Sequence, residues 1–250
     1  MLKRYRMALA ALLMVLVVLP AAAAERVDAL PAVKAYNSSR FEQLLTINGI
    51  PLITGRGEME SNNRLHYVLK TVPSSGLDEE TLEIVVYDGT MYTRENADTQ
   101  WYIEDSDVPI VPPSGDIPAE ANLPFPVTKI GTVNVAGTPT DQYQIWIQDA
   151  AMGDLLKFDL WIGQQMNYIY QEQLAIVTTD PELGELTLAD LHRAYDFDAA
   201  IKVGPPANAK VRPNPTSLTN FSWQNRGLNK LAAPFVSSFV RDAAIARFAR

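Results

Sequence analysis

Short runs of alternating apolar and polar residues, separated by tight-turn signals, limit what this chain can fold into more than any other feature. Residues 65–70 alternate, with Leu65, Tyr67 and Leu69 on one side, and a period of two over this length indicates a half-buried strand. Further strands are expected at 41–47, 82–87, 90–94, 100–103, 127–135, 141–147, 157–163, 167–177 and 185–197. Hairpins rather than helical crossovers join these strands, which argues against a parallel α/β sheet.

The dipeptide Asp88-Gly89 lies between two of these β-prone runs. This dipeptide is a strong signal for a two-residue type I′ hairpin. The turn fixes a register in which Tyr87 faces Thr90 and Val86 faces Met91. One face of the hairpin is then apolar and should point inward; it carries Leu82, Ile84, Val86 and Met91. A single sheet of this many strands must curl, close or split.

Three segments interrupt the strand pattern. Residues 27–36 have helical potential, because Leu30 and Val33 are three apart. Gly55-Arg56-Gly57 marks a break between strands. Residues 108–126 hold six prolines, which exclude regular helix or a central strand and indicate a loop or linker.

The N-terminal 24 residues have the features of an export signal. Three cationic residues within positions 3–6 precede an apolar run of 13 residues at 7–19, and Ala21–Ala24 follow Pro20. The alternative, an uncleaved membrane anchor, would want about 20 apolar residues. We therefore expect residues 1–24 to be a signal peptide and the protein to be exported, to the periplasm or to the extracellular side of the cell envelope.

The net charge of −8 is unevenly distributed. Residues 25–205 carry 28 acids and 11 bases, hence −17, whereas residues 206–250 carry seven bases and one acid, hence +6. The acidic body argues against nucleic-acid binding. Residues 232–246 are expected to form an amphipathic helix ending in basic residues. Three interpretations of this tail remain open: packing on the body, contact with an anionic membrane, or a disordered tail.

The search for catalytic and metal sites predicts none. The chain has no Cys and only two His, His66 and His192, which excludes disulfides, thiolate sites and a multi-His metal site. The nucleophile elbow, P-loop and dinucleotide motifs are absent. His192 lies near Asp190 and Asp196, as in a base and its orienting carboxylate, but no Ser partner is identifiable; His66 is expected to be a surface or satisfied histidine.

Two acidic clusters, at 78–80 and 104–107, lack the spacing of a calcium loop and are expected to be solvated loop charges. A glycosidase-type carboxylate pair stays open as an alternative, because its two members need not be neighbours in the sequence. No cofactor is expected.

Four segments together resemble one known family. They are Glu83–Arg94 followed by Trp101, Ile130-Gly131 to Gly137-Thr138 with Tyr143, Phe158–Ile162 with its Trp-Ile pair, and Tyr195–Phe197 leading to Pro205-Pro206. Over residues 27–206 the chain is similar to the lipoprotein-carrier-like superfamily, which includes LolA-like periplasmic carriers and the mycobacterial LppX–LprG-type lipid-binding proteins. Lipid-anchored members of that family have an N-terminal Cys, which this chain lacks.

The resemblance implies a mainly β (α+β) fold in which a strongly curved antiparallel sheet forms a half-open β-barrel with helices on the concave side. The domain would span 25–206, followed by a basic extension, 207–250. The implied function is that of an exported, non-enzymatic carrier or sensor. Its expected partners are a lipid or acyl chain, a lipoprotein or envelope protein, and a membrane surface contacted through 232–250.

The alternation and the resemblance together select an apolar cavity lining. Its expected residues are Leu65, Tyr67, Leu69, Ile84, Val86, Met91, Ile145, Phe158, Leu160 and Ile162. Two other functions remain open: an envelope protein-interaction or regulatory module that uses the acidic body or the basic tail, and a secreted hydrolase.

Overall fold

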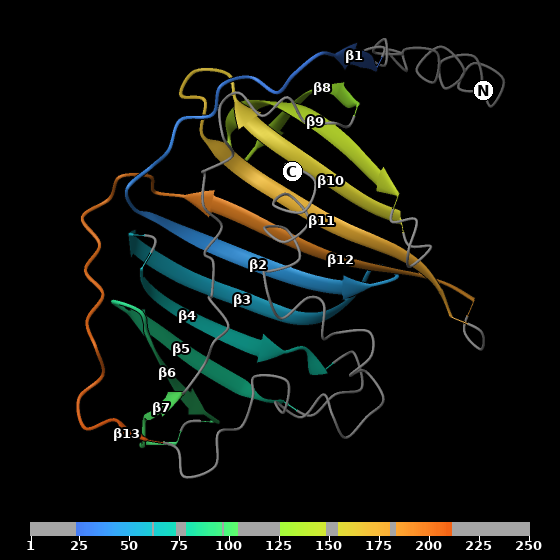
Figure 1. Ribbon diagram of the computed structural model, residues 1–250. Helices are drawn as coiled ribbons and strands as arrows, with labels where there is room; N and C mark the ends of the chain where they lie inside the picture. Colours follow the sequence, from blue (N-terminus) through green and yellow to red (C-terminus); the bar gives the residue numbers. More distant parts are fainter. Residues whose placement is uncertain are drawn as a thin grey trace, which may run out of the picture.

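The computed structural model describes residues 24–61, 63–73, 79–96, 98–104, 126–148, 155–180 and 184–211 (Figure 1). Thirteen strands are found there. They are β1 (Glu25–Val27), β2 (Ser39–Ile47), β3 (Ile50–Ser61), β4 (Arg64–Thr71), β5 (Thr81–Tyr87), β6 (Thr90–Glu95), β7 (Tyr102–Glu104), β8 (Val127–Val135), β9 (Thr138–Gln148), β10 (Leu155–Gly163), β11 (Ile169–Asp180), β12 (Gly184–Tyr195) and β13 (Lys210–Val211).

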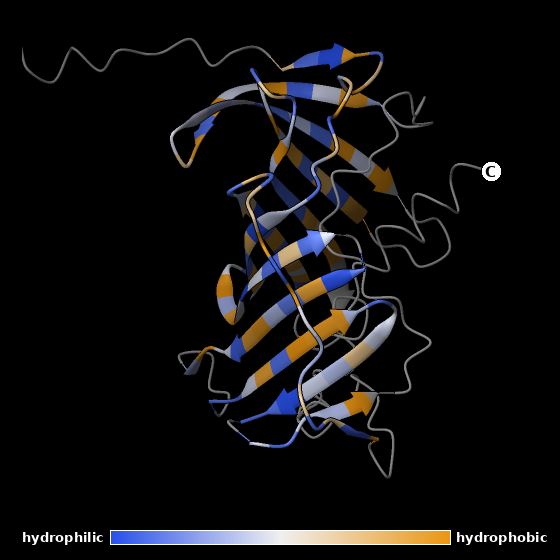
Figure 2. Ribbon diagram, turned by 90° about the vertical axis from the view of Figure 1, so that its left-hand side faces the viewer, coloured by the Kyte–Doolittle hydropathy of each residue, from blue (hydrophilic) through white to orange (hydrophobic). Residues whose placement is uncertain are grey.

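All these strands belong to one sheet, in the order β1-β8-β9-β10-β11-β12-β2-β3-β4-β5-β6-β7-β13. Every neighbouring pair is antiparallel except β13 and β7. The β12–β2 pairing joins strands far apart in the sequence, with Leu191 opposite Leu44. The sheet is twisted and curled (Figure 2). The prediction of a mainly antiparallel β fold built on a curved sheet is therefore confirmed.

The helices expected on the concave side are not found in the described part of the chain. Nor does any described helix have the length and hydropathy needed to cross a membrane. The expectation of a helix at 27–36 is wrong, because this segment is extended up to β2. Pro31 explains the difference: proline disrupts a helix interior and biases the preceding residue toward extended backbone.

The Asp88-Gly89 hairpin is confirmed. Tyr87 pairs with Thr90 and Val86 with Met91, and both turn residues have positive φ, 48° and 86°, as a type I′ turn requires. Asn48-Gly49 forms the same kind of turn between β2 and β3, with φ of 48° and 77°.

The interpretation of Gly55-Arg56-Gly57 as a break between strands is wrong, because all three residues lie within β3. The strand runs through both glycines, which leave room for aromatic rings from neighbouring strands. A Cβ on Gly57 would lie 2.5 Å from Phe41 Cζ and 2.6 Å from the His66 carbonyl oxygen. A Cβ on Gly55 would lie 2.8 Å from the Tyr67 hydroxyl. These glycines therefore permit close side-chain packing within the sheet rather than ending a strand.

We call the face that carries Leu65, Ile84 and Phe158 the inner face, and the opposite face the outer face. The largest buried apolar cluster lies mainly on the inner side of β2, β3 and β8–β12. Leu30 and Val33, from the extended segment before β2, pack against this cluster. The backbone amide of Lys34 donates to the carbonyl oxygen of Asn167 at 2.9 Å. Residues 28–36 thus cover part of the inner face, which helices were expected to cover.

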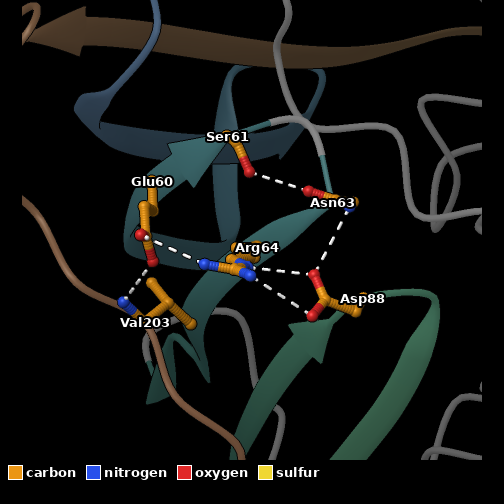
Figure 3. Close-up of polar contacts among 6 residues, drawn as sticks. All are labelled: Glu60, Ser61, Asn63, Arg64, Asp88 and Val203. Carbon is orange, nitrogen blue, oxygen red and sulfur yellow. Dashed lines mark hydrogen bonds and ion pairs between the residues drawn. The ribbon is translucent and has the colours of Figure 1, made fainter.

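The segment after β12, residues 196–209, runs past the ends of strands β2 to β5 toward β13 (orange in Figure 1). Its Ile201 and Val203 pack against Val85 on the outer face. The Val203 amide donates to Glu60 at 2.9 Å (Figure 3). Arg64 connects Glu60 to the hairpin turn. Its Nη1 donates to Glu60 Oε1 at 3.3 Å, and its Nε and Nη2 donate to the two Asp88 carboxylate oxygens at 2.9 and 3.3 Å. This network fixes the segment and two hairpins to one another.

Several expectations fall outside the described residues. They concern the signal segment 1–24 except its last residue, nearly all of the proline-rich stretch 108–126, and the tail beyond Val211 with its expected helix at 232–246. They remain predictions.

Candidate functional site

The strand register places all ten residues of the expected cavity lining on the inner face. Leu65, Tyr67 and Leu69 alternate along β4, and β5 presents Val86 and Ile84 opposite the first two. Met91 of β6 lies opposite Val86. The remaining four lie on β9 and β10, where Phe158 is opposite Ile145; they are Ile145, Phe158, Leu160 and Ile162.

One cross-strand row connects the two groups. It runs from Leu69 through Gly55 of β3, Gln43 of β2, His192 of β12 and Glu172 of β11 to Leu160 of β10. Residues in one such row share a face of the sheet. Strands from the two halves of the sequence therefore contribute to one continuous face, on which a row of mostly polar residues joins the apolar groups of β4–β6 to those of β9 and β10.

This surface contains a buried polar cluster that the sequence pattern did not predict as part of the lining. Asp190 is 8% exposed and lies between Leu45 and Leu174 in the cross-strand register. Gln43 Nε2 donates to both of its carboxylate oxygens, at 2.7 and 2.8 Å. His192 Nε2 lies 3.1 Å from Asp190 Oδ2. A carboxylate in such apolar surroundings needs these partners to offset its lost hydration.

Asp190 is therefore the one of the two expected carboxylates that contacts His192. Asp196 instead accepts from Arg40 Nη1 at 2.8 Å. The alternation of β12 places Asp190 and His192 on the inner side, since both residues are two positions apart on one strand. The alternation of Leu188, Asp190 and His192 along the strand is the sequence pattern that indicates this placement.

Tyr67 is the second polar feature of the inner face. Its ring lies 5.3 Å from that of Phe41, centroid to centroid, and beside the space that a Gly55 side chain would occupy. Its hydroxyl has no hydrogen-bond partner among the described residues. Burial, and next the charge of Asp190, raise the pKa of Tyr67 well above its usual value of 10.0. The inner face thus holds a neutral phenol with an unused donor.

An aromatic cluster occupies one end of the inner face. The ring of Phe197 lies 4.8 Å from that of Tyr168 and 4.9 Å from those of Tyr36 and Tyr170. The Tyr168 hydroxyl donates to Asp198 Oδ2 at 2.6 Å, and this hydrogen bond is the main cause that lowers the pKa of Asp198. These contacts connect the segments before β2, before β11 and after β12.

The outer face holds charged ladders. His66 Nε2 lies 2.8 Å from Glu83 Oε1, and Arg94 forms an ion pair with the other oxygen of the same carboxylate. Burial acts to raise the pKa of Glu83, but the hydrogen bonds from Arg94 and His66 outweigh it, so the pKa is lowered. His66 is therefore a satisfied histidine, as predicted.

The described residues contain no group of three or more His, Cys, Asp or Glu side chains that could hold a metal ion. The two acidic clusters of the sequence, 78–80 and 104–107, lie mostly outside these residues. The inner face thus offers a largely apolar surface with a small polar centre.

No family model matches the chain, and no curated protein matches it. Among solved structures, the chain is similar to a DUF1329 family protein from Desulfovibrio piger, with 11% identity, a TM-score of 0.26, and coverage of 67% of this chain and 88% of that one. A putative outer membrane lipoprotein-sorting protein domain from Vibrio parahaemolyticus has 8% identity, a TM-score of 0.25, and coverage of 68% and 89%.

A LolA superfamily protein from Nitrosomonas europaea has 11% identity, a TM-score of 0.22, and coverage of 68% and 89%. These last two descriptions name the group that the sequence motifs resemble. At TM-scores of 0.26 and below, these similarities carry no inference about function.

Proposed function

We propose that the protein is a non-enzymatic carrier or sensor that holds a lipid, an acyl chain or a lipidated partner on the inner face of its sheet. One observation carries this proposal. The ten residues selected as an apolar lining come from two separate stretches of the sequence, β4–β6 and β9–β10, and the register puts all of them on a single face.

The architecture supports the same conclusion. Every strand of the described residues belongs to one sheet, so no second described sheet covers the inner face as in a β-sandwich. Seven of the ten lining residues are nevertheless buried, so a ligand would have to displace the groups that cover them. Leu30 and Val33, from the segment before β2, pack against the largest apolar cluster of this face. Tyr67, Leu69 and Val86, at the β4–β5 part, are only partly buried. Partly buried apolar groups on a curved face suit an apolar ligand.

The polar centre would orient such a ligand. The Tyr67 hydroxyl is buried and has no partner among the described residues, so it would donate to a carbonyl or ester oxygen of a bound molecule only where that molecule displaces the side chains that cover it. The Asp190 carboxylate, already paired with Gln43 and His192, would keep its own hydrogen bonds. An apolar surface with few fixed polar groups gives both affinity and orientation. We further propose that the protein acts outside the cytoplasm, as the expected signal segment implies.

A matched pair of variants tests the proposal with Nile red, an uncharged dye that fluoresces in apolar sites. Val86 is half-buried on the inner face, and Val177 is half-buried on the outer face of β11. Val86→Asn should weaken dye binding about tenfold, since the lost apolar contact corresponds to roughly 1.4 kcal/mol. Val177→Asn should bind the dye as the unmodified chain does. Equal affinities for all three chains, or no binding at all, would contradict the proposal.

A further inference from the structure

A groove of about 510 Å³ lies on the outer face, across β12, β2, β3 and β4. Its lining residues come from these four strands alone. They include three apolar side chains and three cationic ones: Leu44, Val68, Leu191, Arg56, Lys70 and Arg193. This groove is separate from the proposed inner-face site, because the strand alternation directs these six side chains to the opposite face.

The groove has an apolar floor. Leu191 lies directly opposite Leu44, and Val68 lies opposite Arg56. All three apolar residues are half-buried. Two facing leucines beside the charged side chains of the groove form a local apolar patch, which suits the hydrocarbon part of a ligand.

The charge of the groove is opposite to that of the whole protein. Arg56, Lys70 and Arg193 face a single carboxylate, Glu42, among the lining residues, while the chain as a whole carries −8. Glu42 lies opposite both arginines in the register and offsets one positive charge. Two positive charges then remain in excess, which favours an anion.

Arg193 is held in place without losing its charge. Its Nε and Nη2 both donate to Gln171 Oε1, at 3.2 Å each. Because this acceptor is a neutral amide, the guanidinium is positioned by a group that does not neutralise it. A fixed, weakly hydrated guanidinium is well suited to bind a carboxylate or phosphate.

We propose that this groove binds a single-chain amphiphile with an anionic headgroup, its chain on Leu44, Val68 and Leu191 and its headgroup at the cationic side chains Arg56, Lys70 and Arg193. The volume fits a molecule of this size, because ligand sites of small molecules span about 300–1,000 Å³. The inference goes beyond the proposed function, since it assigns a second site with a charged ligand to the other face of the sheet.

Isothermal titration of the full chain with dodecanoate, and with uncharged dodecanol of the same chain length, tests the groove. The test variant is Arg56→Gln/Arg193→Gln. The control is Lys202→Gln/Lys210→Gln, which removes the same charge from exposed positions outside the groove. Arg56, Lys202 and Lys210 are exposed and Arg193 is half-buried, so neutralising these four side chains should leave the core intact, and urea unfolding of each variant verifies this.

The dodecanoate binding step that belongs to the groove should be about tenfold weaker in the test variant than in the unmodified chain and unchanged in the control, while any dodecanoate bound to the inner face should be the same in all three chains. Dodecanol affinity should be the same in all three. An equal loss of dodecanoate affinity in both double variants, or no loss in either, would overturn the proposal. Nile red binding to the inner face is read separately, so failure of this site and failure of the proposed function give different results.

Discussion

Removal of the Tyr67 hydroxyl should stabilise the protein, which is the reverse of the usual effect of deleting a polar group. The hydroxyl is buried and has no hydrogen-bond partner in the described part of the structure. An unsatisfied buried polar group costs about 1–3 kcal/mol of desolvation. Phenylalanine retains the ring contact with Phe41 without this cost. We therefore expect Tyr67→Phe to raise the free energy of unfolding by about 1–2 kcal/mol in ligand-free protein.

Tyr168→Phe provides the matched control, because the Tyr168 hydroxyl, unlike that of Tyr67, forms a hydrogen bond that the substitution removes. Its hydroxyl donates to Asp198 Oδ2 at 2.6 Å, and its ring is buried against Phe197. A net hydrogen bond contributes about 1 kcal/mol. Asp198 is exposed to solvent, so we expect a loss near that value rather than the larger value of a buried charged pair.

The assay is urea unfolding of both variants after bound lipid has been removed by unfolding and refolding. Opposite signs are expected: Tyr67→Phe more stable and Tyr168→Phe less stable than the unmodified chain. A loss of stability in Tyr67→Phe comparable to that in Tyr168→Phe would refute the argument, since it would mean that the Tyr67 hydroxyl makes a stabilising hydrogen bond.

Three further predictions concern packing and charge. Gly57→Ala should lower the free energy of unfolding by about 1–3 kcal/mol, because the new methyl group overlaps a backbone oxygen and a buried ring; Gly204→Ala, which meets no atom within 4 Å, should change it by less than about 1 kcal/mol in the same urea titration. The carboxyl pKa values of Glu83, Asp141 and Asp198 are all lowered in the folded protein. Each ionised carboxylate therefore stabilises the folded state at pH values above its ordinary pKa, and this stabilisation is lost as the pH falls through the pKa of the folded state. Thermal unfolding should show decreasing stability from about pH 5 to about pH 3. Glu83→Gln should reduce this acid dependence, and an unchanged pH profile in that variant would contradict the role of its ion pairs.

The strands of this protein could be predicted where a turn fixed the local register. Asp88-Gly89 determined which residues of β5 and β6 face each other, and therefore that Ile84 and Val86 share the inner face. The same reasoning applied to Asn48-Gly49 would have predicted β3. The strand was missed because Gly55 and Gly57 resemble loop residues when the rings of Tyr67 and Phe41 are not yet known to lie beside them.

The order of strands across the sheet could not be predicted from the sequence. The pairing of β12 with β2 spans more than half of the described chain, and no local signal specifies such a contact. The polar centre depends on this pairing, since Gln43 comes from β2 and Asp190 from β12. The sequence therefore predicted the apolar lining, which depends on alternation within each strand, but not the buried carboxylate at its centre.

Native mass spectrometry of the full chain purified from its own host tests the central claim most directly. We expect a population of the protein that is heavier by the mass of a lipid or acyl-chain compound, and this extra mass should disappear after extraction with organic solvent. A chain that carries no such compound, and that binds neither Nile red nor a fluorescent fatty acid, would contradict the proposal that the inner face holds an apolar ligand.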